Sequence, residues 1–283
     1  MSRSDAGELV MRVAQQMMCL AFGRGLVAPF SIILISLGAI GATAQTTLMP
    51  PSGSSTATGR CSFKGMVSLN FDDGNVDVLQ YAVPIMRSSA LVGTFYVVTD
   101  RIGTRGYLSA SDLNELQRAG NEIGAHTRKH RDLTLLSEDD VRNEVAGSKA
   151  ALGAMGLDVS TFAYPFGSFN GRVEQAVKDA GFVGARSTNS GTNTPSTDRF
   201  ALLRLDMNDA TTLEGVEAAI QGAITKNEWL ILAFHHVNGA YAGRPKVVDL
   251  VFFRGLAEYL AERQVPVVTN TQAISSMLNC IPD

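Results

Sequence analysis

The chain has 283 residues, of which 45% are hydrophobic and 18% are charged, and its formal net charge is −3. This length suits one large domain or two small ones, and the apolar content is enough for a sizeable core and excludes a disordered tail. Because the sequence has no block of like charge and no basic stripe, it argues against a nucleic-acid-binding surface.

The first 44 residues are predicted to be an export signal. Arg24 precedes an apolar run that ends at residues 42–44, Ala-Thr-Ala, the small-x-small pattern of a cleavage site. The leader before Arg24 is long, and three later methionines are alternative starts: Met11, Met17 and Met18. An uncleaved membrane anchor is the alternative reading, but the run is short for a span and contains Pro29. We therefore expect a secreted or periplasmic protein with no stable membrane insertion after cleavage.

Residues 45–60 are rich in Ser, Thr, Gly and Pro and are predicted to form a flexible linker. No comparable linker occurs later in the chain, so residues 61–283 are predicted to form one folded domain. Cys61 and Cys280 stand near the two ends of this domain. Because domain termini often lie close together, the two cysteines could form a disulfide in an oxidising compartment. Two unrelated free thiols are the alternative.

From residue 65 onward, short β-rich runs alternate with longer helical patterns. Strands are expected over residues 65–71, 92–98, 121–126, 160–165, 181–187, 201–207, 228–234 and 265–269. Helices are expected over residues 76–89, 109–120, 137–156, 213–225 and 247–263. Near-continuous apolar strands that alternate with helices indicate a parallel sheet covered by helices. Seven or eight such units in about 220 residues favour a distorted (β/α) barrel of seven or eight parallel strands with outer helices.

Local signals refine three of these helices. Pro84 is expected to kink the helix over residues 76–89. Ser109 or Ser111 is expected to cap the next helix, with Gly120 as its stop, and Ser137 is expected to begin the helix after that.

The residues with catalytic chemistry stand at the ends of predicted strands. "NFDDG", "GAHTRKH", "YPFGS" and "FHH" each occur where an expected strand finishes. In a (β/α) barrel, the reactive residues lie at the carboxyl ends of the strands. The sequence therefore predicts one site that collects all four segments.

His126 and His130 are two of only four histidines in the chain. At a spacing of four they can face one point on a helical turn and supply two metal ligands; two solvated surface histidines are the alternative. Asp72 and Asp73 directly follow an apolar strand, where adjacent carboxylates repel unless a cation or a shifted pKa relieves them; plain turn chemistry is the alternative. Two histidines and one carboxylate make a metal site with room for water, as in catalytic zinc sites.

The other two histidines, His235 and His236, are adjacent after the strand at residues 228–234. Because side chains on a strand alternate between its two faces, only one of them can point into the site. A buried structural histidine is the ordinary alternative.

These residues resemble a known family. "LNFDDG", "EIGAHTRKH", "FAYPFG" and "LILAFHH" occur in the order and spacing of the polysaccharide deacetylases, the NodB-homology domain of carbohydrate esterase family 4. The resemblance extends from about residue 64 to residue 275.

The resemblance implies roles for individual residues. Asp73, His126 and His130 would ligate a divalent metal, with zinc expected, and Asp72 would be the general base. His235 would be the general acid. The "YPFG" segment (Tyr164, Pro165, Phe166 and Gly167) would line the substrate site, with the backbone N–H of Phe166 near the oxyanion.

The sequence departs from the family pattern in two places. Many members carry an arginine before the third-motif proline that pairs with the catalytic base, but here the position is Ala163. We hypothesise that Arg204 supplies the missing guanidinium from a neighbouring strand; a surface salt bridge is the alternative. The fourth motif matches poorly, and Asp206 is a candidate for orienting His235. No role can be assigned to His236.

The sequence thus predicts a secreted, metal-dependent deacetylase of an N-acetylated glycan such as chitin, peptidoglycan or poly-N-acetylglucosamine. One alternative keeps the site and takes an O-acetylated polysaccharide such as xylan. The other is a catalytically silent glycan-binding protein on the same scaffold, for which Tyr164, Phe166, Phe169 or Trp229 could stack sugars.

Overall fold

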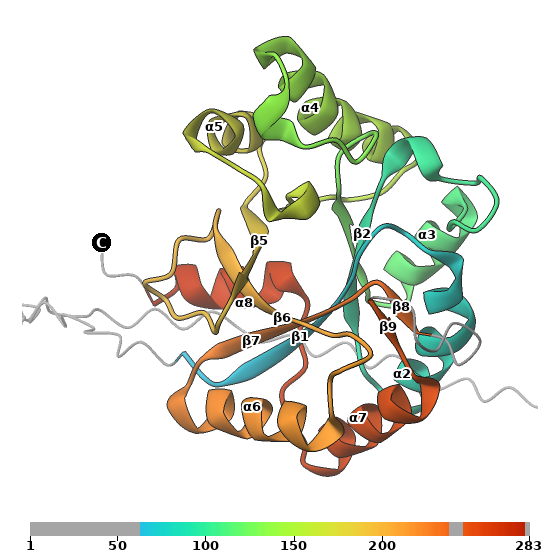
Figure 1. Cartoon of the computed structure of the whole chain (residues 1–283), viewed down its shortest axis with the longest axis vertical. Coiled ribbons are helices and arrows are strands. Elements are labelled where there is room, and N and C mark those ends of the chain that lie inside the picture. Colours follow the sequence, from blue (N-terminus) through green and yellow to red (C-terminus); the bar gives the residue numbers. More distant parts are fainter. Residues whose placement is uncertain (1–62, 238–245, 281–283) are drawn as a thin grey trace, which may run out of the picture. The chain divides into compact units, whose positions relative to one another are not determined.

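Seven parallel strands close into a barrel, in the order in which they occur along the chain (Figure 1). The computed structural model describes residues 63–237 and 246–280, all of which belong to the unit that begins at Ala57. The strands are β1 Met66–Phe71, β2 Gly93–Val97, β3 Glu122–Ala125, β4 Thr161–Ala163, β5 Gly184–Ser190, β6 Leu202–Asp206 and β7 Trp229–Phe234. Pairing of β1 with β7, from Met66↔Trp229 to Phe71↔Phe234, closes the barrel. The predicted (β/α) barrel is therefore confirmed, with seven strands.

Most helices lie around the outside of the barrel, whereas the last one packs against Met66, Leu202 and Trp229 at the amino ends of the strands (Figure 1). The α-helices are α2 Val83–Ser88, α3 Ala110–Arg118, α4 Glu138–Ala154, α5 Gly171–Asp179, α6 Leu213–Lys226, α7 Leu250–Glu262 and α8 Asn270–Leu278. Single helical turns are η1 Val78–Ala82, η2 Thr99–Arg101, η3 Leu133–Leu135 and η4 Pro165–Gly167. A small parallel ribbon pairs β8 His236–Val237 with β9 Val247–Val248. Within the described residues, no helix is long and apolar enough to cross a membrane.

Hydrogen bonds at the helix starts explain several of the predicted boundaries. The Ser109 side chain accepts from the Asp112 N–H, and the Asp112 carboxylate accepts from the Ser109 N–H, which makes Ser109 the cap of α3. Ser137 caps α4 in the same position. Gly120 lies two residues beyond α3 with φ +88°, a conformation that favours glycine.

The two faces of the strands carry different chemistry. Phe71 stacks between Phe95 and Phe234, which places apolar rings between the strands and the outer helices. Inside the barrel, Asn70 exchanges side-chain hydrogen bonds with Asn270, the first residue of α8. Because side chains alternate along a strand, the residue two positions after Asn70 also faces the barrel interior, at its carboxyl end.

The structure departs from the sequence prediction in three places. Residues 265–269 are not a strand; Val267 forms only an isolated bridge with Val67, on the edge of β1 that pairs with β2 from Leu69 onward. The helix over residues 76–89 contains a π-helical turn, η1, directly before Pro84. Helices α5 and α8 were not predicted.

Three predictions concern residues outside the described part of the chain. The export signal (1–44), the linker (45–60) and Cys61 all fall there, so they stay predictions. Cys280, the other member of the predicted pair, is disulfide-bonded.

Candidate active site

Four strand ends bring the predicted residues together at one end of the barrel. Asp72 and Asp73 follow β1, His126 follows β3, the Pro-Phe-Gly turn follows β4, and His235 follows β7. All these strands are parallel, so their carboxyl ends meet at the same rim. The backbone N–H of Asp72 also donates to the carbonyl of Phe234 (2.8 Å), which joins the first segment to the last.

Asp73, His126 and His130 form a compact set of metal-ligand atoms. One ligand atom from each lies within 4.8 Å of the others, and His130 Nε2 is 3.4 Å from Asp73 Oδ1. His126 Nδ1 contacts the carbonyl of Ala163 at 2.7 Å. Because a carbonyl can only accept, Nδ1 carries the proton and Nε2 keeps its lone pair for a metal.

Burial keeps both imidazoles of this set neutral, which is the form that binds metals. Burial lowers the pKa of His126. Burial, together with neighbouring His126 and Arg101, lowers the pKa of His130 to about 4. Among the described residues this is the one cluster of three or more potential ligands of this kind.

The segment between the two histidines is a loop rather than a helical turn. Thr127 and His130 both adopt left-handed conformations, with φ of 65° and 58°. The His130 N–H donates to Thr127 Oγ1 at 2.9 Å. The buried Glu144 carboxylate of α4 accepts from two further N–H groups of the loop, those of Arg128 (3.0 Å) and Lys129 (2.8 Å). Glu144 of α4 therefore fixes the shape of the loop.

Asp72 is buried at the rim and pairs with Arg186 of β5. Arg186 Nη2 lies 2.5 Å from Asp72 Oδ1, and the two side chains are only 2% and 5% exposed. Burial alone would raise the pKa of Asp72, but the charge of Arg186, helped by the nearby histidines, holds it well below its usual range. Asp72 therefore stays a carboxylate with one oxygen, Oδ2, free of the guanidinium.

Arg186 corrects the hypothesis that Arg204 pairs with Asp72. Arg204 Nη1 instead bonds Asp206 Oδ1 at 2.5 Å, two residues along the same strand. Arg186 is the register partner of Ala163 across β4 and β5. Paired residues of parallel strands point to the same face, so Arg186 delivers a guanidinium to the region that an arginine at position 163 would reach. The signal was present in "GARS", but pairing register cannot be read from one sequence.

His235 lies between two carboxylates. Its Nε2 is 3.8 Å from Asp72 Oδ2, and its Nδ1 is 4.0 Å from Asp206 Oδ1. The second distance is too long for a hydrogen bond, so Asp206 neighbours the predicted acid without bonding it. Burial is the main cause that lowers the pKa of His235 to about 4, and nearby Lys246 adds to this effect.

His236 faces away from His235, as alternation requires. Its Nδ1 lies 3.1 Å and 3.2 Å from the two carboxylate oxygens of Asp77, and the Val237 N–H donates to the same carboxylate. His236 thus connects the β8–β9 ribbon to the helix that follows β1.

The "YPFG" segment turns sharply beside the metal ligands. Phe166 has φ 59° and is 62% exposed, and its ring meets the His130 ring edge-on at 4.7 Å. Gly167 has φ +72°, and a Cβ there would lie 2.1 Å from Thr188 Oγ1. Pro165 is buried in the turn.

Of the four aromatic residues considered for sugar stacking, only Phe166 is exposed. Tyr164 is buried, donates its hydroxyl to the Phe200 carbonyl and stacks on Phe169 at 4.6 Å. Trp229 is fully buried and donates to Ser68. These three side chains therefore serve the core.

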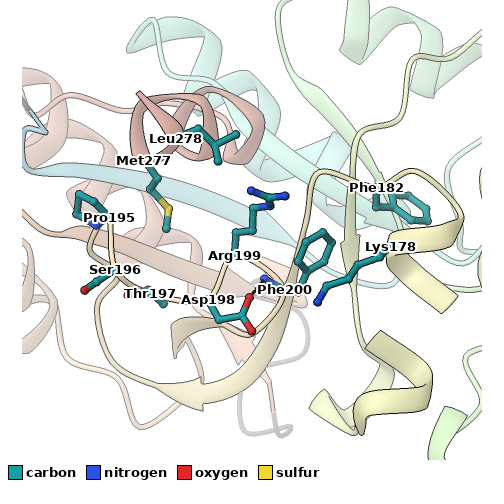
Figure 2. A pocket seen from close by; sticks show the side chains of 10 residues that line it. All are labelled: Lys178, Phe182, Pro195, Ser196, Thr197, Asp198, Arg199, Phe200, Met277 and Leu278. Atoms are coloured by element: carbon teal, nitrogen blue, oxygen red, sulfur yellow. Dashed lines mark hydrogen bonds between the residues drawn. The ribbon is translucent and has the colours of Figure 1, made fainter. Parts of the chain in front are cut away.

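The barrel also has a cavity of about 670 Å³, whose lining side chains are drawn in Figure 2. Its walls come from the end of α5, the loop directly before β6 and the end of α8, including Arg199, Phe200 and Met277. It is thus near the amino end of β6, whereas the metal-ligand set lies at carboxyl strand ends. It contains none of the predicted site residues.

Comparisons with known proteins agree with this geometry. Residues 59–185 match the family model described as "Polysaccharide deacetylase". YxkH of Bacillus subtilis (strain 168), which its name classes with the polysaccharide deacetylases, is 27% identical over 140 residues, 49% of this chain and 50% of that protein. The poly-beta-1,6-N-acetyl-D-glucosamine N-deacetylase of Staphylococcus aureus (strain N315) is 25% identical, over 52% of this chain and 56% of that protein. This chain therefore spans about half the length of each of these two relatives.

A solved structure supports the fold. The family 4 acetyl xylan esterase of Clostridium thermocellum, in complex with a cobalt ion, superposes with a TM-score of 0.55 at 20% identity. The match covers 77% of this chain and 93% of that one. At this identity the likeness establishes the shared barrel fold.

Proposed function

Because this chain belongs to the polysaccharide deacetylase family, we propose that it is a metal-dependent hydrolase that removes acetyl groups from an N-acetylated glycan. The observation that carries the proposal is the meeting of three groups at one rim. These groups are the metal-ligand set, the ionised Asp72 and the imidazole of His235.

The donor set fits a divalent metal, with zinc expected. Two neutral imidazoles and one carboxylate within 4.8 Å are a combination that zinc prefers. The hydrogen bond from His126 Nδ1 to Ala163 orients the first imidazole. A metal bound by Asp73, His126 and His130 would activate water and polarise the acetyl carbonyl.

The protein's own groups divide the proton transfers. Asp72 Oδ2, which is free of Arg186, takes a proton from the attacking water. His235, in its imidazolium form, gives its Nε2 proton to the nitrogen of the departing sugar as the C–N bond breaks and is left as a neutral imidazole. The backbone N–H of Phe166 donates to the acetyl oxygen as negative charge develops on it. Asp72 Oδ2 and His235 Nε2 lie 3.8 Å apart, so both groups can reach the same reacting carbon and its substituents.

We further propose that the mature protein acts outside the cytoplasm, on the basis of the predicted export signal. Its polymeric substrate would reach the open rim of the barrel, where the exposed Phe166 ring lies beside His130.

The test is acetate release from N-acetylglucosamine oligomers by the mature chain, stripped of metal and reloaded with zinc. Metal-dependent release that Asp73→Ala abolishes is the expected result. Tight glycan binding with no release under any divalent metal would instead identify a silent glycan-binding protein.

O-deacetylation is the second candidate, favoured by a relative whose name pairs xylanase with deacetylase activity. This bifunctional xylanase/deacetylase of Pseudobutyrivibrio xylanivorans is 23% identical over 55% of this chain. Faster release from acetylated xylan than from N-acetylglucosamine oligomers would select it.

A further inference from the structure

The cations at the site differ in how their charges are matched. Arg186 pairs with Asp72, Arg204 with Asp206, and Arg101 with Asp73 at 3.4 Å. Lys246 is the exception: within residues 63–237 and 246–280 it forms no ion pair with a carboxylate. Its Nζ lies 3.3 Å from His235 Nε2.

This contact falls on the nitrogen that delivers the proton in the proposed reaction. A leaving group that takes a proton from His235 Nε2 must occupy the position that the Lys246 ammonium holds. An ammonium beside an imidazole also disfavours the protonated imidazole. The Lys246 ammonium and the nitrogen of a departing sugar therefore compete for the position next to His235 Nε2.

The position of Lys246 is fixed by its ribbon. The His236 N–H donates to the Lys246 carbonyl at 3.3 Å, and His236 pairs in register with Val247. His236 and the Val237 N–H both bind the buried Asp77 carboxylate, four residues after Asp73. The ribbon is thus tied to the segment that carries the base and a metal ligand.

We infer that Lys246 is a specificity-determining residue that pairs with a carboxylate on the glycan, beside the sugar that loses its acetyl group. A carboxylate draws the ammonium away from His235 Nε2 and frees that nitrogen for the leaving group. The preferred substrate class is then an anionic N-acetylated glycan. His236 acts through the ribbon as a positioning residue. This inference rests on the proposed deacetylase function.

The test uses one oligosaccharide in two forms. The first is an alternating oligomer of N-acetylglucosamine and N-acetylmuramic acid with free carboxylates, and the second is the same oligomer with those carboxylates converted to primary amides. We expect kcat/KM of the zinc-loaded enzyme to favour the free acid by about fivefold, the range of a single exposed charge contact. Because that contact is screened by salt, about 0.5 M sodium chloride should reduce the preference.

Three variants assign the preference to the ribbon. Lys246→Met should abolish the preference by lowering kcat/KM for the acid and raising it for the amide. Lys246→Arg should keep the preference, and Lys226→Met, an exposed lysine at the end of α6, is the matched control. His236→Ala should weaken the preference while zinc content stays at one per chain.

Two results would overturn the inference while leaving the proposed function in place. One is a wild-type enzyme that deacetylates both forms equally well. The other is a Lys246→Met variant that loses the same factor on both forms. Failure of the wild-type enzyme to release acetate from any glycan would remove the proposed function, and this inference with it.

Discussion

Replacing Arg186 should disable the site more than any other change outside the ligands, the base and the acid. Arg186→Ala leaves the Asp72 carboxylate buried without its cation, and breaking a buried ion pair in this way costs about 3–5 kcal/mol. It also frees the carboxylate to rotate, and a shift of about 1 Å in a catalytic group costs roughly 100-fold in rate. We therefore expect kcat to fall by about 100-fold or more, with a lower urea midpoint.

Arg204→Ala is the comparison that separates the two arginines. Its partner Asp206 is 37% exposed, so water can replace the lost charge and the effect on kcat should be much smaller. Acetate release under saturating zinc and glycan, with urea unfolding on the same samples, measures both quantities. Equal losses of kcat in the two variants would refute the assignment of Arg186.

Moving the arginine from β5 to its paired position on β4 tests whether the guanidinium can reach Asp72 from either strand. The double variant Ala163→Arg/Arg186→Ala moves the guanidinium to the neighbouring strand, about 4.8 Å away, at the paired position. The long side chain can cover that distance, and deletion of the Arg186 side chain makes the room. We expect at least tenfold more activity than in Arg186→Ala. A folded double variant with no recovery would show that the guanidinium must enter from β5.

Three further predictions concern metal binding and the turn beside it. Zinc at 100 times its Kd should add about 2.7 kcal/mol to the free energy of unfolding of the metal-stripped protein. The Tm of the protein should then rise by roughly 5–10 °C in a thermal scan. Asp73→Ala should remove this rise. Glu144→Gln removes the charge of the carboxylate that accepts hydrogen bonds from the ligand loop. It should weaken zinc binding by about 10-fold in a chelator competition. Unchanged zinc affinity would mean that the loop keeps its shape without this charge. Gly167 has φ +72°, and a Cβ there would meet Thr188. Gly167→Ala should therefore lower the free energy of unfolding in urea by about 1–3 kcal/mol. Gly153→Ala in α4 is the control, because a Cβ there meets nothing within 4 Å, and it should be neutral or stabilising.

Much of the fold could be predicted because its signals are local. Apolar runs marked all seven strands, and Ser109 and Ser137 marked helix starts that their hydrogen bonds account for. The extra strand at residues 265–269 was a pattern error of a different kind. Its valines are apolar enough for a strand, but β2 pairs with the same edge of β1 from Leu69 onward, which leaves Val267 a single bridge at Val67. Which strand occupies an edge is a property of the whole sheet and leaves no trace in a short window.

The site was predictable where it depends on the residues directly after each strand. Asp73, His126 and His130 converge because parallel strands bring their carboxyl ends to one rim. The shape of the ligand loop was not predictable from spacing. Two left-handed residues, Thr127 and His130, make the segment a loop rather than a helical turn. The loop is stabilised by the bond from the His130 N–H to Thr127 and by Glu144 of α4, which accepts from the N–H groups of Arg128 and Lys129, 16 and 15 positions earlier in the chain.

The ion pair of Asp72 shows that a sequence motif does not by itself determine which residues form a site. A motif fixes a residue by its position along the chain, whereas the carboxylate responds only to where a positive charge lies in space. In a parallel barrel, Ala163 and Arg186 are 23 residues apart in sequence yet adjacent in register, so an arginine on either strand can serve the same oxygen. The sequence pointed to Arg204 because it lies in a neighbouring predicted strand, but that strand also carries Asp206, which takes the guanidinium. An alanine in the third motif is therefore weak evidence for a silent protein when the neighbouring strand carries an arginine in register with it.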